Sequence, residues 1–271
     1  MVAPDSLDAN DLHGTTRSEP PEAPEHAGLD NRLVWATLFF ALAVAAKFPG
    51  LDLLVSARYF DAARGFFHAQ DPLVVALYDW TPWLGRGLAL LMAIHALTAP
   101  WLARGLMACG RAELARRCQG PWRRVSAVFV CAALLGPGLV IEGVFKNTMG
   151  RPRPVQTIEF GGTEAFHGPF RPGHNPESHR SFTSSHAAAG FALMGLGLTC
   201  GPLWRRRWLL IGLVAGGVVG LGRILQGGHY LTDVVFSFYA VWLSCELVAW
   251  VDGRRLSKGQ PPPSRRHRPA A

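Results

Sequence analysis

The chain has 271 residues, of which 49% are hydrophobic, and its formal net charge is +8. Several apolar runs approach the roughly 20 residues that cross a bilayer, which excludes an ordinary soluble domain. The basic residues flank these runs and form no stripe interleaved with aromatic residues, so the charge does not indicate nucleic acid as a partner.

In chain order, residues 1–32 are polar, acidic and proline-containing, and we expect them to form a disordered N-terminal arm. Residues 33–252 are expected to fold as one domain, an all-α bundle of six transmembrane helices in a polytopic membrane protein. Residues 253–271 would be a disordered basic tail. The six expected spans are 33–48, 81–102, 125–145, 186–204, 208–221 and 230–251.

Two stretches between the spans have patterns of their own. Residues 49–80 mix apolar and charged side chains, which favours a short helix in the membrane interface over an ordinary loop. Residues 155–180 are rich in Gly, Pro and His, and a loop of this length beside a site typically shapes substrate access. The five cysteines have no metal-ligand spacing, so we expect no metal and no cofactor.

The arginines predict an orientation, because short cytoplasmic loops carry an excess of Lys and Arg. Fifteen basic residues lie in the three segments 104–124, 205–207 and 254–268. We therefore expect these segments and both termini in the cytoplasm. Three polar clusters, at 146–154, 184–186 and 223–233, would then lie together on the opposite face of the membrane.

The third cluster pairs His229 with Asp233, four residues later and on the same helical face. A carboxylate one turn from an imidazole can fix its tautomer and leave the other ring nitrogen free to attack or to accept a proton. Arg223 precedes the pair, and Gly227-Gly228 would allow a close approach. The alternative is a histidine at the membrane boundary with an acid near a helix start.

The other two clusters supply hydroxyls and cations. Ser184, Ser185 and His186 stand at a helix start, where hydroxyls and amides either bind an anion or only cap the helix. Lys146 ends the third span, and Arg151 and Arg153 are each followed by proline, which would hold both guanidinium groups for phosphate or for lipid headgroups. Glu142, one turn before Lys146, is interpreted as a partner for Lys146 or another cation of the clusters.

The three clusters together resemble the type 2 phosphatidic acid phosphatase superfamily over roughly residues 33–252. The motifs are Lys-Asn-Thr-Met-Gly-Arg-Pro-Arg-Pro from Lys146, Thr-Ser-Ser-His ending at His186, and Gly-Arg-Ile-Leu-Gln-Gly-Gly-His-Tyr-Leu-Thr-Asp ending at Asp233. The resemblance implies a metal-independent membrane phosphatase that works through a phosphohistidine. By that resemblance His229 is the nucleophile, Asp233 orients it and His186 is the general acid. The residues it assigns to phosphate binding are Lys146, Arg153, Ser184, Ser185 and Arg223.

The chain departs from the family pattern at three positions. Thr183 stands where Pro is usual, Ser185 where Gly is usual and Gly222 where Ser is usual. Ser185 matters most, because Gly there allows close backbone approach to phosphate. Every charged position of the pattern is present, so we expect activity with an altered substrate shape.

Gly150-Arg-Pro-Arg-Pro154 with Glu159-Phe-Gly-Gly162 resembles bacterial members that act on lipid A. We therefore expect a phosphorylated lipid, with lipid A favoured, in a bacterial inner membrane with the site facing the periplasm. Undecaprenyl diphosphate and phosphatidylglycerol phosphate remain alternative substrates, and a membrane protein that only binds lipid phosphate is the non-enzymatic alternative. The soluble vanadate-binding oxidases share the motifs but not the spans, a transporter would place polar groups mid-span, and the sequence predicts no oligomeric state.

Overall fold

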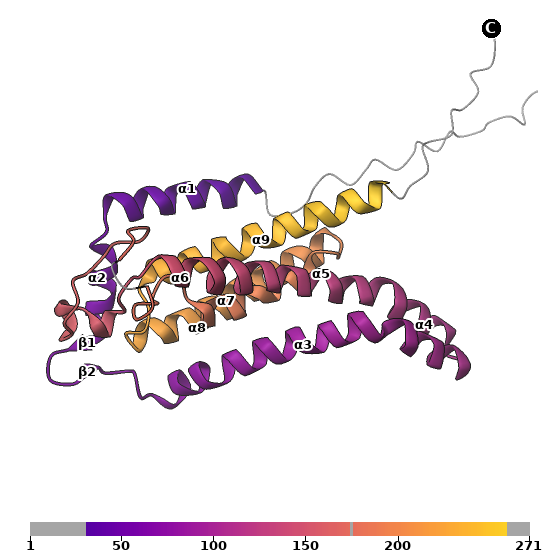
Figure 1. Ribbon diagram of the computed structural model, residues 1–271, viewed down its shortest axis with the longest axis horizontal. Helices are drawn as coiled ribbons and strands as arrows, with labels where there is room; N and C mark the ends of the chain where they lie inside the picture. The colour runs from indigo at the N-terminus through magenta and orange to yellow at the C-terminus, as the bar shows by residue number, and fades with distance from the viewer. Residues whose placement is uncertain (1–30, 174–175, 259–271) are drawn as a thin grey trace, which may run out of the picture.

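The computed structural model describes residues 31–173 and 176–258 and is almost entirely helical (Figure 1). Long helices run along its length, with α1 (Asn31–Lys47) on one side and α3 (Pro72–Ala108) on the other. The predicted disordered arm and tail lie largely outside the described residues. Asn31 and Arg32 begin α1, and α9 (Leu231–Lys258) continues six residues past the expected end of the domain.

The chain bends sharply directly after α1. α1 is followed by α2 (Leu51–Ala57) at an angle of 86°. A short antiparallel hairpin, β1 (Phe60–Asp61) and β2 (Gly65–Phe66), then leads into α3. The amphipathic stretch 49–80 is therefore a short helix, a hairpin and the first turns of α3, and α3 begins well before the predicted residue 81.

The third membrane helix is longer than predicted and changes its winding along the way. It runs as α4 (Ala112–Arg117), a π-helical turn (Cys118–Trp122), α5 (Arg123–Ala133), a second π-helical segment (Leu134–Phe145) and α6 (Lys146–Thr148). Much of the expected cytoplasmic loop 104–124 is thus helical. Pro121 and Pro137 lie inside the two π-helical segments, where a proline's missing N–H disturbs the usual hydrogen-bond ladder.

The predicted fourth and fifth spans have different boundaries in the structure. α7 (Ser185–Phe191) passes into a 3₁₀ segment (Ala192–Gly197). α8 (Pro202–Leu225) then includes Arg205–Arg207, which lie between the two spans predicted at 186–204 and 208–221. Pro202 at the first position favours a helix start there. Among the described residues four helices are long and apolar enough to span a membrane, or five if α1 and α2 form one span, so the count of six is not confirmed.

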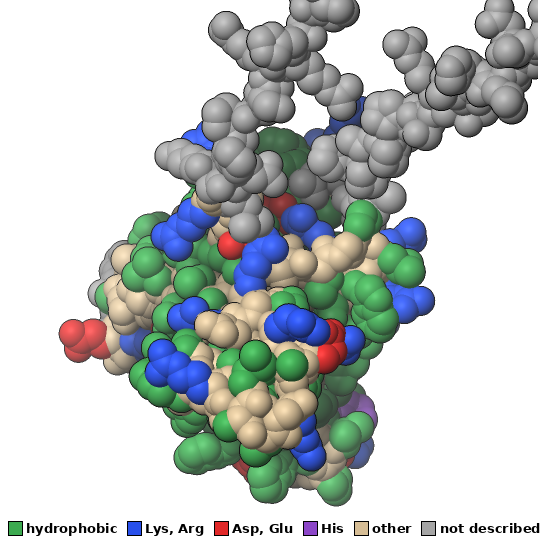
Figure 2. All heavy atoms as spheres, turned by 90° about the vertical axis from the view of Figure 1, so that its right-hand side faces the viewer, with side chains coloured by type: hydrophobic (Ala, Val, Ile, Leu, Met, Phe, Trp, Pro, Cys, Tyr) green, Lys and Arg blue, Asp and Glu red, His purple; other side chains and the backbone are tan. Residues whose placement is uncertain are grey.

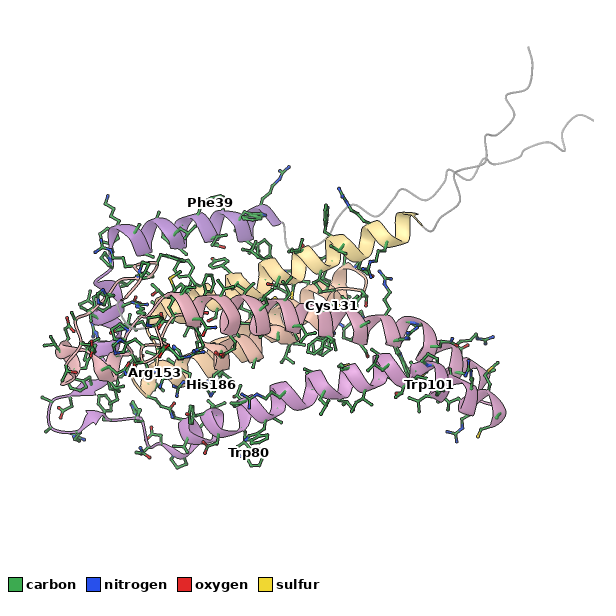
Figure 3. The ribbon with its side chains drawn as sticks, viewed as in Figure 1. Phe39, Trp80, Trp101, Cys131, Arg153 and His186 are labelled. Carbon is green, nitrogen blue, oxygen red and sulfur yellow. The ribbon has the colours of Figure 1, made fainter. Side chains whose placement is uncertain are left out.

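The core lies along α9, of whose most apolar stretch 50% is buried, compared with 11% for α3. Val234, Val241 and Cys245 of α9 pack in one cluster with Phe191 of α7 and Ile141 of the third helix. Large apolar side chains on α1, α3 and α8 are exposed, among them Phe39, Trp80 and Trp101, which are labelled in Figure 3. Such a surface is expected of helices whose solvent is lipid.

Glycines let two core helices approach closely. A Cβ added at Gly190 of α7 would lie 2.6 Å from the Cα and N of Gly216 on α8. Small residues at a membrane helix interface permit backbone contact of this kind, and van der Waals packing then holds the helices together. α7 and α8 therefore form a closely packed pair.

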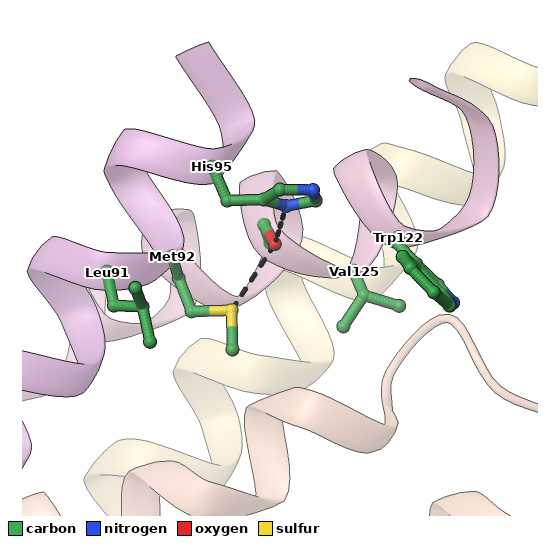
Figure 4. Close-up of a pocket in the computed structure, with 6 residues that line it drawn as sticks. Leu91, Met92, His95, Trp122 and Val125 are labelled. Atoms are coloured by element: carbon green, nitrogen blue, oxygen red, sulfur yellow. Dashed lines mark hydrogen bonds between the residues drawn. The ribbon is translucent and has the colours of Figure 1, made fainter. Parts of the chain in front are cut away.

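A pocket of about 380 Å³ lies between α3 and the start of α5, and Leu91, Met92, Val125 and Trp122 line it (Figure 4). Its polar groups satisfy one another: Ser126 Oγ lies 2.8 Å from His95 Nδ1 and donates to Met92 Sδ at 3.3 Å. None of the motif residues lines it, so this pocket is separate from the site described next.

Candidate active site

The structure brings the three sequence clusters to one end of the bundle. Lys146 ends the third helix and Arg223 lies in the last turn of α8, while His229 stands in the turn before α9 and Asp233 in its first turn. Arg153 and His186 lie near each other at this end (Figure 3). Lys146 and His229, which are 83 residues apart in the sequence, are thus close enough for the charge of Lys146 to act on His229.

The predicted cations act on the same imidazole. The positive charges of Arg223, Lys146 and Arg153 all interact electrostatically with His186. The charges of Arg153 and Arg223 repel each other. Lys146 is 6% exposed and Arg223 is 7% exposed. Grouping buried like charges is unfavourable unless an anion joins them, so this arrangement suits an anionic ligand.

Lys146 and Arg223 retain donors for such an anion. Within the described residues Lys146 Nζ donates one hydrogen bond, to the carbonyl of Arg180 at 3.0 Å, and an ammonium has three protons. Arg223 Nη1 donates to Gln226, while its Nε is buried without a hydrogen-bond partner in the described part of the chain. A phosphate oxygen could accept from these remaining donors.

His229 and Asp233 form the predicted pair. His229 Nδ1 lies 3.5 Å from Asp233 Oδ2, longer than an ordinary hydrogen bond, and the two side chains are 2% and 0% exposed. Burial lowers the pKa of His229 to about 3, although the Asp233 carboxylate opposes that shift. The imidazole is therefore neutral at pH 7, which leaves a lone pair on a ring nitrogen for nucleophilic attack.

Asp233 is held by partners that the sequence did not reveal. Its Oδ2 accepts from Ser181 Oγ at 2.6 Å and from the amide of Tyr230 at 2.9 Å, and its Oδ1 accepts from Arg151 Nη1 at 2.5 Å. The bond from Tyr230, the residue before α9, to a carboxylate in the first turn is one half of a capping box. Asp233 thus stabilises the start of α9 and also faces His229.

Arg151 is not available for phosphate. Its guanidinium is 1% exposed and donates to Asp233, to Asp52 and to the carbonyl of His167. Of the two arginines that prolines stiffen, Arg153 is the one whose charge is among the main influences on His186. The Arg-Pro-Arg-Pro run gave no signal that its two arginines would have different roles.

Tyr78 on α3 is a further residue of the site that the sequence did not indicate. Its ring stacks on the His186 imidazole with centroids 4.9 Å apart and planes at 16°, and the Arg223 guanidinium lies over the same ring at 4.5 Å. A ring in contact with both groups fixes their positions and supplies a face attractive to the cation. Tyr78 belongs to no motif.

The serines before His186 divide their roles. Ser184 caps α7, because its Oγ accepts from the amide of Ala187 at 3.4 Å, while its own amide donates to Ser237. The Ser185 hydroxyl donates to Glu142. Capping therefore occurs at Ser184, and a contact of either serine with phosphate stays a prediction.

Glu142 forms its ion pair with Arg180 and acts on Lys146 at longer range. Its carboxylate lies 3.5 Å from Arg180 Nη2 in addition to the Ser185 contact, and it makes no direct ion pair with Lys146. Its charge still acts on Lys146 through space. Glu142 therefore interacts with the motif cation Lys146 electrostatically, while its ion pair is with Arg180.

The motif segment matches a known family. The model of the PAP2 superfamily matches residues 126–256, which contain all three clusters. A lipid A 4'-phosphatase of Francisella tularensis subsp. novicida (strain U112) is 31% identical over 219 residues, which are 78% of this chain and 90% of that protein. The chain belongs to the PAP2 superfamily. It is a phosphatase of that family.

Two further relatives are named for the same activity. Lipid A 4'-phosphatases of Rhizobium etli (strain ATCC 51251 / DSM 11541 / JCM 21823 / NBRC 15573 / CFN 42) and Rhizobium leguminosarum are 30% and 31% identical, over 80% and 76% of this chain. The matches cover 83% and 88% of those proteins. No solved structure matches the chain.

Proposed function

We propose that this protein is a lipid A phosphatase of a bacterial inner membrane, and that it works through a phosphohistidine at His229. The substrate is supported by three similar proteins named for that activity, matched over most of their length. The nucleophile is supported by the placement of a neutral, buried imidazole beside Asp233 and near the cations Lys146 and Arg223. This pairing is the observation that carries the mechanism.

In the first step a nitrogen of His229 attacks phosphorus. Because Nδ1 faces Asp233, Nε2 is the nitrogen left to form the bond. His186 takes up a proton once the negative charge of the bound phosphate offsets the cations around it. The bond from phosphorus to the lipid oxygen breaks, and His186 gives this proton to that oxygen. The ring of His229 becomes positively charged as it takes up the phosphoryl group, and Asp233 stabilises that charge.

In the second step water attacks phosphorus and the bond to His229 breaks. His186, now neutral, accepts the proton of the water and returns to its starting state. Inorganic phosphate leaves, and both histidines regain their original protonation. The protons and the phosphoryl group therefore balance over one cycle.

Lys146, Arg153 and Arg223 would hold the oxygens of the transferring group. In phosphoryl transfer the negative charge spreads over three oxygens, and cations placed in advance stabilise it without reorganisation. The unpartnered Nε of Arg223 supports this role. Ser184 and the amide of Ser185 would complete the binding site.

We propose that this end of the bundle faces the periplasm and that both termini are cytoplasmic. The opposite end, which Figure 2 faces, carries many Lys and Arg side chains and few acids. Its arginines include Arg116 and Arg117 on α4 and Arg205–Arg207 at the start of α8. Such a bias is typical of a cytoplasmic surface.

The test compares lipid A from cells that express the wild type, His229→Ala, or His68→Ala, which replaces an exposed histidine outside the site. Mass spectrometry should show loss of one phosphate in the wild type and in His68→Ala, and full retention in His229→Ala. Dephosphorylation by His229→Ala would overturn the nucleophile. If lipid A keeps its phosphates while undecaprenyl diphosphate is hydrolysed, the second substrate replaces the first.

A further inference from the structure

A second buried carboxylate, Asp52, lies at the start of α9. Asp52 belongs to the first turn of α2 and is 0% exposed. The bend of 86° between α1 and α2 turns α2 away from the direction of the bundle, across its outer end (Figure 1). Asp52 therefore meets α9 although the two are about 180 residues apart in the sequence.

Both oxygens of Asp52 are fully engaged. Oδ1 accepts from the amide of Thr232 at 2.9 Å, and Oδ2 accepts from Thr232 Oγ1 at 2.6 Å and from Arg151 Nη2 at 2.7 Å. The amide of Thr232 is one of the first four of α9, which have no partner within the helix. Asp52 thus stabilises the start of α9 from another part of the chain.

Arg151 connects Asp52 to Asp233. Nη2 binds Asp52, and Nη1 binds Asp233 at 2.5 Å and Thr232 Oγ1 at 3.0 Å. The guanidinium also lies 4.2 Å from the centre of the Tyr230 ring. A planar fork with a donor for each carboxylate holds both acids in fixed positions, which a lysine could not do.

The charges of this network explain why two acids are needed. Asp52, Arg151 and Asp233 together carry one net negative charge. Without Asp52, the arginine alone would neutralise Asp233, which is the group that faces His229. A net negative charge beside His229 stabilises the positive ring formed when the imidazole takes up phosphate.

We propose that Asp52 is a positioning residue of the phosphatase reaction, which acts through Arg151 to keep Asp233 oriented and negative toward His229. Asp52 lies before the residues that match the family, 126–256, and contacts neither His229 nor the predicted phosphate-binding residues. The inference rests on the proposed role of His229.

The first variant is Asp52→Asn, in which the amide nitrogen replaces the oxygen that accepts from Arg151 while the shape is kept. In detergent micelles that contain lipid A, we expect kcat to fall about 10- to 100-fold, as when an outer hydrogen-bond partner that orients a reactive group is removed. KM should stay within about twofold, because Asp52 is buried away from the substrate. The matched control is Asp252→Asn, which breaks the ion pair with Arg124 far along α9 and should leave both constants unchanged.

Arg151→Lys is the second variant and serves if Asp52→Asn does not fold, which monodispersity and thermal unfolding would reveal. It keeps the charge but loses the fork, so kcat should again fall with KM unchanged. Wild-type kcat in a folded Asp52→Asn or Arg151→Lys protein, or a rise in KM with kcat intact, would overturn the proposal. His229→Ala, assayed in parallel, separates the two inferences. If His229→Ala is active, the role of His229 as nucleophile is refuted. If His229→Ala is inactive while Asp52→Asn is fully active, only the role of Asp52 is refuted.

Discussion

Gly228 provides a way to displace Arg223 without changing its charge. A Cβ added at Gly228 would lie 2.7 Å from Cζ of the Arg223 guanidinium, and closer still to Nη2. Because no backbone atom is among the three nearest atoms, Gly228→Ala would push the guanidinium away and leave the helices in place. The variant therefore tests the site and not the fold.

The expected magnitude follows from the interaction that is lost. A hydrogen bond to a charged group contributes about 1.5–3 kcal/mol, and about 1.4 kcal/mol corresponds to a factor of ten. If Arg223 no longer reaches the phosphate, kcat/KM should fall roughly 10- to 100-fold. Because the Tyr78 ring packs against both Arg223 and His186, the displaced guanidinium has little room to shift and still reach the phosphate.

The assay is phosphate release from lipid A in mixed micelles, with thermal unfolding measured on the same samples. Gly217→Ala is the matched control, because a Cβ there would meet nothing within 4 Å. We expect Gly228→Ala to lose activity at unchanged unfolding temperature and Gly217→Ala to resemble the wild type. Wild-type kcat/KM in Gly228→Ala would refute the placement of Arg223 against this glycine.

Three more predictions concern the fold, the chemistry and the topology. Gly190→Ala should lower stability by about 1–3 kcal/mol, measured by thermal unfolding, because its Cβ would press on the backbone of Gly216; an unchanged unfolding temperature would contradict the close packing of α7 and α8. Activity should survive EDTA, since the described residues contain no group of three or more His, Cys, Asp and Glu side chains placed to hold a metal ion. Loss of activity in EDTA that a divalent ion restores would contradict this prediction. A cysteine at Thr163 should react with an impermeant thiol reagent in spheroplasts while one at Arg206 should not, and the reverse labelling would place the site in the cytoplasm.

The local part of the site could be predicted from the sequence. The four-residue spacing of His229 and Asp233 sets their pairing, and alternation of apolar runs with polar clusters brings Lys146, His186 and Arg223 to one end. These inferences need only helical geometry and the thickness of a bilayer. Contacts set by helical spacing or by the span pattern can therefore be predicted from the sequence.

The long-range part could not be predicted. Asp52 and Tyr78 reach the site from α2 and α3, and their contacts depend on the bend after α1 and on how α3 lies against the bundle. Hydropathy reports whether a segment can be buried but not which distant side chain it will meet. The same limit explains why the ion pair of Glu142 with Arg180, from a loop with no regular pattern, was not predicted.

The span boundaries were missed for a related reason. Arg205–Arg207 indicated a turn, but Pro202 starts α8 before them, and Arg205 forms an ion pair with Glu246 of α9 at 2.7 Å. A charged residue with a partner can continue a helix that its hydropathy would end. The apolar pattern of residues 186–204 likewise did not indicate the 3₁₀ segment after α7.

The sparse burial of α3 has a practical consequence for handling the protein. Only 11% of its most apolar stretch is covered by the rest of the chain, yet Tyr78 near its outer end contacts both His186 and Arg223. In a membrane, acyl chains would cover the rest of this apolar surface and support the helix. Short-chain detergents, which withdraw that support, should therefore inactivate the enzyme before its α7–α9 core unfolds, and nanodiscs or long-chain maltosides are the better choice for kinetic work.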